Sequence, residues 1–208
     1  KGRQTHGSRP WGGIDPIVAA ADIIGTAQTI VSRRMNISDL PVVVSFGAIK
    51  GGIRYNIIPD EVELIGTIRT FDEGMRQKVF ADLISVAKNV AAAHGATVIT
   101  EVPDTKGNPV TVNNPALTAR SLPGLIQAAG AANVVNMSLV MGAEDFSYYA
   151  QEVPGFFFFV GATPVGKDAS SAPSNHSPQF FLDEAALPLG TRALLQVSLD
   201  YLSGATDD

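Results

Sequence analysis

The chain has 208 residues, 45% of them hydrophobic, and a formal net charge of −5. This length suffices for one large domain or two small ones. The acidic balance argues against a general nucleic-acid or anionic-membrane binder, and no apolar run reaches the length of a membrane span. The chain has no cysteine, which excludes disulfides and thiolate metal ligands within it.

The first half of the chain alternates between extended and helical patterns. Asp15 followed by Pro16 predicts a helix start, Asp72 predicts a second one, and Gly95 predicts where the second helix ends. The expected elements are a strand ending near residue 5, a helix over residues 16–34, strands over 42–49 and 61–69, a helix over 72–94 and a strand over 96–102. This order predicts a ferredoxin-like domain, in which four antiparallel strands carry two helices on one face.

The two central strands of this domain form the segment around which we expect the rest to be organised. Residues 42–49 are rich in β-branched side chains, and residues 61–69 alternate between apolar and polar. Pro59 cannot donate to a strand ladder and therefore marks the crossover between them. An antiparallel pair of this kind places Asn56 at the tip and Arg69 well along the returning strand.

A second region follows an expected boundary at residues 104–108. It predicts helices over residues 115–130, after 145 and over 183–202, and strands over 134–141 and 156–160. This alternation favours part of a parallel α/β layer. With two strands the layer cannot cover its own sheet, so we expect a segment outside this chain to complete it. The predicted domains are therefore residues 1–106 and 107–208.

Few residues here are suited to catalysis by their type and position. His94 falls on the last turn of a predicted helix and is interpreted as a surface histidine. Taken alone, His6 and His176 are more often loop residues than ligands, and they have no companions at zinc-site spacing. Glu144 and Asp145 stand between a predicted buried strand and a helix, where α/β proteins bind ligands.

Five ordered motifs nevertheless carry a family resemblance. They are GRQTHGSRPWGGIDP, NIIPDEVELIGTIRT, MGAEDFSYY, VPGFFFFVG and NHSPQFFLDEAAL, which begin at residues 2, 56, 141, 153 and 175. In this order they resemble zinc-dependent amidohydrolases, the aminoacylase, hippurate hydrolase and auxin-conjugate hydrolase group of the carboxypeptidase G superfamily. The resemblance implies a complete lid and dimerisation domain followed by the C-terminal part of a catalytic α/β domain. The N-terminal half, with the remaining metal ligands and a glutamate pair, would lie outside this chain.

The resemblance also implies roles for individual residues. His176 matches a metal ligand, and His6 matches the lid histidine that reaches the neighbouring subunit's active site to stabilise the oxyanion. Asn56 and Arg69 match positions that hold the substrate's carboxylate, which suits the planar guanidinium fork. Glu144 lies beside the site with no assigned role.

We therefore expect part of a metal-dependent amidohydrolase that cleaves N-acyl amino acids or peptide-like substrates, inactive as this chain alone. The complete enzyme would use two divalent metal ions, with zinc first and manganese, cobalt or nickel as alternatives, and would dimerise through the lid. One alternative is a dipeptidase or carboxypeptidase of the same superfamily. An alternative of another class is a non-catalytic dimerisation or ligand-binding module. No nucleic-acid or membrane partner is expected. The chain begins at Lys1 without an apolar leader, which we interpret as an internal start, so cytoplasm and periplasm both remain open.

Overall fold

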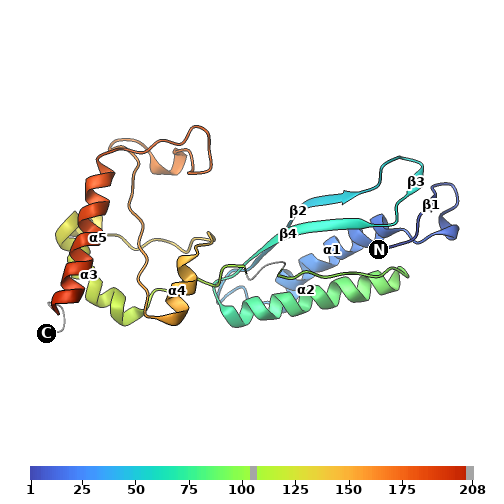
Figure 1. Ribbon diagram of the computed structural model, residues 1–208, viewed down its shortest axis with the longest axis horizontal. Helices are drawn as coiled ribbons and strands as arrows, with labels where there is room; N and C mark the ends of the chain where they lie inside the picture. Colours follow the sequence, from blue (N-terminus) through green and yellow to red (C-terminus); the bar gives the residue numbers. More distant parts are fainter. Residues whose placement is uncertain (104–106, 205–208) are drawn as a thin grey trace. The chain divides into compact units, whose positions relative to one another are not determined.

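The protein's structure is a computed structural model that describes residues 1–103 and 107–204 (Figure 1). Its elements are β1 (Thr5–His6), η1 (Pro10–Gly12), α1 (Pro16–Arg34), β2 (Val43–Gly51), β3 (Ile57–Ile58), β4 (Val62–Arg69), α2 (Glu73–Ala93), α3 (Pro115–Ala129), η2 (Ala131–Asn133), α4 (Phe146–Glu152), η3 (Ala169–Ser171) and α5 (Ala186–Ser203). The mixed α/β class expected from the sequence is confirmed.

The chain divides into two compact units. Unit 1 comprises residues 1–110 and 141–143, and unit 2 comprises residues 111–140 and 144 onward. The expected boundary at residues 104–108 includes residues 104–106, which lie outside the described residues. The predicted domain limits at residues 106 and 107 remain a prediction.

Helices α1 and α2 begin where their capping residues predict, and α2 also ends where Gly95 predicts. The Asp15 carboxylate accepts a hydrogen bond from the Ile17 N–H at 2.8 Å, and Asp72 accepts from the Met75 N–H at 2.7 Å. Each carboxylate satisfies a backbone donor that the first helical turn leaves unpaired. After α2, Gly95 has φ of +70°, a conformation that costs glycine little.

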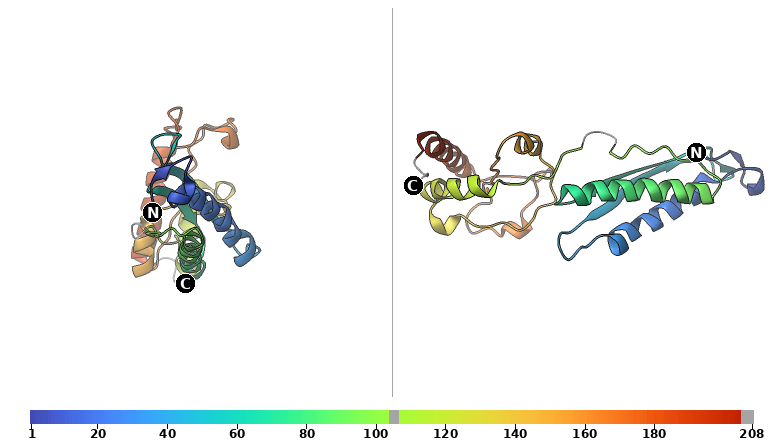
Figure 2. Two further views of the ribbon diagram at one scale, coloured as in Figure 1. Left: turned by 90° about the vertical axis from the view of Figure 1, so that its right-hand side faces the viewer. Right: turned by 90° about the horizontal axis from the view of Figure 1, so that it is seen from below.

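Strands β2 and β4 pair antiparallel, as predicted, in a register that runs from Val43 opposite Arg69 to Gly51 opposite Val62. Helices α1 and α2 run alongside this pair in Figures 1 and 2. The core between them contains Ile30 of α1 and Val79 of α2, both fully buried, together with Val44 of β2. Burial of such side chains contributes about 1.5–3 kcal/mol each, so this core supports unit 1.

The strand predicted over residues 96–102 is wrong, because these residues form no strand in the structure. Thr97 and Lys1 exchange backbone hydrogen bonds at 2.8 and 2.9 Å, and the Gly2 N–H donates to the Asp60 carbonyl at 2.7 Å. These contacts give the side-by-side order of segments that the ferredoxin-like pattern requires. The described residues after Thr97 join no ladder, and a segment is a strand only where another backbone pairs with it.

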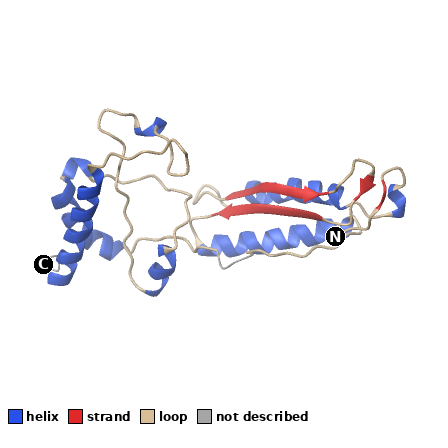
Figure 3. Ribbon diagram, turned by 45° about the horizontal axis from the view of Figure 1, so that its top comes forward, coloured by secondary structure: helices blue, strands red, loops and turns tan. Residues whose placement is uncertain are grey.

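Unit 2 consists of a helical layer and extended segments. Leu125 and Ala128 of α3 pack with Ala193 of α5, and Val134, Phe156 and Phe158 pack against this cluster. The predicted strands over residues 134–141 and 156–160 are drawn as loops in Figure 3, because within the described ranges they join no ladder. The Asn113 side chain hydrogen-bonds both the N–H and the C=O of Phe157, at 2.7 and 2.8 Å. The Asn113 side chain thus makes the two hydrogen bonds that the backbone of a neighbouring strand would make with Phe157.

Among the described residues, the helices include none with the length and apolar character needed to cross a membrane.

Candidate functional site

The tip of unit 1 brings two of the predicted site residues together. His6 of β1 pairs with Ile57 of β3, and the Gly7 N–H donates to the Asn56 carbonyl at 2.8 Å. A Cβ on Gly7 would lie 3.2 Å from that carbonyl oxygen, so a glycine permits this close approach. Segments 50 residues apart in the sequence therefore place His6 and Asn56 at one end of the unit.

The His6 ring is exposed and held by a neighbour in the sequence. Its Nδ1 lies 3.1 Å from the Ser8 backbone nitrogen and 2.7 Å from the Ser8 hydroxyl oxygen. The Arg9 N–H donates to the His6 carbonyl at 2.8 Å, so residues 6–9 form a turn. The sequence predicted a role for His6 and none for Ser8, although a serine two positions after a histidine can bond its ring within a turn.

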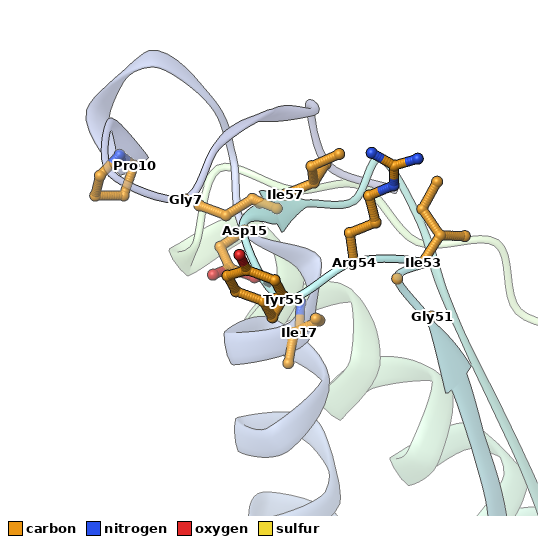
Figure 4. A pocket seen from close by; sticks show the side chains of 11 residues that line it. Gly7, Pro10, Asp15, Ile17, Gly51, Ile53, Arg54, Tyr55 and Ile57 are labelled. Carbon is orange, nitrogen blue, oxygen red and sulfur yellow. Dashed lines mark hydrogen bonds between the residues drawn. The ribbon is translucent and has the colours of Figure 1, made fainter.

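An open depression of about 630 Å³ lies beside this tip (Figure 4). It is lined by Gly7, Pro10, Asp15, Ile17, residues 51–55, Ile57 and Ile58. The side chains of Arg54 and Tyr55 point to opposite sides of the turn that carries them. The Asp15 carboxylate is bonded to the start of α1, and among the described residues no carboxylate pairs with Arg54. Arg54 is thus a cation near Asn56 that the sequence-based reasoning missed.

Arg69 lies at the other end of the strand pair, where it is partly buried opposite Val43. Arg69 is seven positions after Val62 at the start of β4, which in an extended strand is about 24 Å. One unit therefore cannot bring Arg69 and Asn56 to the same carboxylate.

Unit 2 carries the other two predicted site residues. The Glu144 backbone carbonyl accepts hydrogen bonds from the Ser147 hydroxyl at 2.6 Å and from the Ser147 N–H at 3.2 Å. His176 is exposed in a turn that the Ser177 N–H closes on the Ser174 carbonyl at 2.9 Å. No hydrogen bond or ion pair joins Glu144 to His176 in the part of the chain that the structure describes.

The remaining histidine has a structural role. His94 Nε2 lies 2.8 Å from the Asp22 carboxylate of α1. The His94 side chain is 26% exposed, which agrees with its interpretation as a partly exposed surface residue. Among residues 1–103 and 107–204, no three histidine or acidic side chains are grouped so that they could hold a metal ion. The described residues therefore group no such set of ligands around His176, whose role as a metal ligand stays a prediction.

Comparison with curated proteins identifies relatives along nearly the whole chain. The chain is 33% identical over 203 residues to the "Putative amidohydrolase YhaA" of Bacillus subtilis, a match that covers 96% of the chain and 49% of that protein. It is 36% identical to "Thermostable carboxypeptidase 2" of Saccharolobus solfataricus, with the same coverage of both. It is 34% identical to an "N-acetylcysteine deacetylase" of Bacillus subtilis, over 97% of the chain and 50% of that protein.

Solved structures of similar proteins also match nearly the whole chain. A putative aminohydrolase from methicillin-resistant Staphylococcus aureus superposes with a TM-score of 0.75 at 27% identity, over 97% of the chain and 50% of that protein. The Bacillus subtilis YXEP protein, described as a dinuclear metal-binding peptidase, gives 0.63 at 28% identity, over 91% of the chain and 47% of that protein. The chain spans about half the length of these relatives. The model of peptidase family M20/M25/M40 matches residues 8–200, and the chain belongs to that family.

Proposed function

We propose that the whole protein containing this chain is a metal-dependent amidohydrolase that cleaves the amide bond of N-acyl amino acids. The observation that carries this proposal is the tip of unit 1, where His6 and Asn56 lie on hydrogen-bonded neighbouring segments. The His6 ring can donate a hydrogen bond, as an amide's tetrahedral oxyanion requires, and the Asn56 amide beside it can donate to the substrate's carboxylate. In other hydrolases one such donor is worth about 3 kcal/mol.

The substrate's carboxylate is bound in this proposal by Asn56 and Arg69. These residues lie at opposite ends of the extended segment that leads into and through β4, so they meet one substrate only if they come from different subunits. A guanidinium binds a carboxylate with a planar pair of donors, which suits Arg69 for this role.

A homodimer through unit 1 would provide this arrangement. Strand β2 pairs with β4 on one side, and no strand among the described residues pairs with its other edge. Its outward-facing Val43 and Ile49 are 37% and 54% exposed. A two-fold copy would cover this open edge with the same edge of its partner, and each His6 would then act in the partner's site.

His176 is the residue of this chain that we propose as a metal ligand. The described residues do not supply the other ligands of such a centre. The YXEP protein is described as a dinuclear metal-binding peptidase, which supports the proposal of two ions here. Two divalent ions, of which zinc is the first choice, would when bound supply an activated water. Glu144 is proposed to lie near the substrate.

A second reading within the family is a carboxypeptidase or dipeptidase, and the 36% identity to a protein named as a carboxypeptidase favours it. A third is a binding or dimerisation module without catalysis. Assays of the whole protein with N-acetyl amino acids and with dipeptides would distinguish the three. Hydrolysis of the first indicates an amidohydrolase, hydrolysis of the second indicates a peptidase, and hydrolysis of neither indicates a module without catalysis.

A complementation experiment tests the proposed trans arrangement. His6→Ala and His176→Ala forms of the whole protein are unfolded and refolded together. Random mixing makes half of the dimers mixed, and each mixed dimer has one site with both histidines, so activity should recover to about a quarter of wild type. Each variant refolded alone is the control. Mixed dimers that form by mass measurement yet stay inactive would show that His6 does not act across subunits.

A further inference from the structure

The contact between Ser8 and His6 has a chemical consequence for the His6 ring. Residues 6–9 form a turn in which the Arg9 N–H donates to the His6 carbonyl, while the Ser8 N–H points at His6 Nδ1 from 3.1 Å. The His6 ring thereby occupies the place that an Asn or Asp side chain takes when it accepts from the N–H two residues on. This is a local arrangement that His6, Gly7 and Ser8 can form among themselves.

The direction of this hydrogen bond decides which ring nitrogen carries the proton. A backbone N–H only donates, so Nδ1 must accept through its lone pair and cannot carry a proton. In the neutral ring the proton then lies on Nε2. The Ser8 hydroxyl, 2.7 Å from Nδ1, can turn to donate to the same lone pair.

We propose that Ser8 is a positioning residue, which holds His6 as the Nε2–H tautomer with Nε2 directed away from its own turn. This proposal rests on the proposed function, in which His6 donates to the oxyanion. A histidine whose Nδ1 is already bonded keeps one ring orientation and presents one donor, and such preorganisation is what an oxyanion site requires. The close approach of Gly7 to Asn56 fixes the backbone of the same turn.

The test uses the whole protein, metal-loaded and labelled with ¹⁵N-histidine, with the His6 signals assigned by their loss in His6→Gln. Long-range ¹⁵N–¹H spectra of the neutral ring should show a protonated Nε2 and an unprotonated Nδ1. Ser8→Ala removes the shorter contact to Nδ1, the hydroxyl at 2.7 Å, and leaves only the backbone N–H at 3.1 Å. It should therefore raise the fraction of the Nδ1–H form and lower kcat for N-acyl amino acids by about 2-fold to 12-fold with KM little changed. Ser8→Thr, which keeps the hydroxyl and the N–H, should have the wild-type spectrum and the wild-type kcat.

The matched control is Ser32→Ala, which also removes an exposed hydroxyl, one bonded to the Gln28 carbonyl in α1. It should change neither the spectrum nor kcat. A protonated Nδ1 in the wild type, or a Ser8→Ala protein with unchanged spectrum or unchanged kcat, would overturn the proposal. The spectrum reports on Ser8 even if N-acyl amino acids prove not to be substrates, so failure of the proposed function is distinguishable.

Discussion

Unit 1 buries apolar side chains of its strands and helices in a core, whereas unit 2 leaves much of the apolar surface of its extended segments exposed. In unit 1 the strands pair with one another and two helices bury Ile30 and Val79 completely. In unit 2 the buried cluster consists of Leu125, Ala128 and Ala193, while Leu139 and Phe159 of the extended segments are 63% and 54% exposed. The difference is one of partners, because unit 1 contains its ladder partners and the described part of unit 2 does not.

The largest expected effect concerns folding of the separated units. Residues 1–103 alone should unfold cooperatively, because their cores and central strand pair lie within that range. Residues 111–204 alone should lack a cooperative transition and bind ANS, since their extended apolar segments have no ladder. Circular dichroism during urea titration, with ANS fluorescence, measures both. A sharp transition for residues 111–204 would break the comparison.

The second prediction tests the core of unit 1. Ile30→Ala should lower the unfolding free energy of residues 1–103 by about 2–5 kcal/mol, because it leaves a cavity in a packed interior. Ile49→Ala removes the same atoms from a side chain that is 54% exposed, and is the matched control. Equal losses in the two variants, measured by urea denaturation, would contradict the assigned core.

The third prediction concerns the two arginines of unit 1. Arg69→Ala in the whole protein should raise KM for N-acyl amino acids by a factor that corresponds to about 1.5–3 kcal/mol. The amides of the same substrates, which lack the carboxylate charge, should respond much less. Arg54→Ala is the matched comparison, because it removes the same charge near Asn56. If Arg54→Ala, and not Arg69→Ala, abolishes the difference in KM between the free acids and their amides, the carboxylate is bound at the tip. The role proposed for Arg69 is then wrong.

The fourth prediction compares helix caps across the units. Asp72 caps α2, and Asn114 caps α3 through a hydrogen bond to the Leu117 N–H at 2.9 Å. Replacement of either by alanine should cost about 1 kcal/mol, since capping is local and does not depend on a ladder. Hydrogen exchange in the first turn of each helix, in the whole protein, measures it. A loss confined to unit 1 would show that the Asn114 cap does not form.

The smallest expected effect depends on pH. Hydrogen bonds from Lys78 and Arg34 lower the pKa of Asp82 below its ordinary value. A carboxyl with a lowered folded pKa stabilises the fold above the unfolded value of about 3.9, and this stabilisation is lost as pH falls through the lower folded pKa. Asp82→Asn should therefore cost about 0.5–1 kcal/mol at pH 7 and little near pH 2. A loss that is equally large at pH 2 would exclude the charge as its cause.

The helices were predictable in both units, because their signals are local. Asp15, Asp72 and Asn114 cap α1, α2 and α3, and the β2–β4 pair also followed from alternation and a short connection. The strands expected over residues 96–102, 134–141 and 156–160 did not form. Alternating or apolar runs show that a segment suits a sheet, but a strand exists only when another segment supplies its hydrogen bonds.

For the candidate site, the sequence by itself determined which residue types are present and, through five ordered motifs, the family to which they belong. Only the tertiary structure decided their grouping, in which His6 lies beside Asn56, Arg69 lies at the far end of β4, and Ser8 holds Nδ1 of His6. The physical reason is that helix caps and turns are completed by residues a few positions apart. The meeting of residues 6 and 56 depends instead on a strand pairing, whose register the local sequence does not specify.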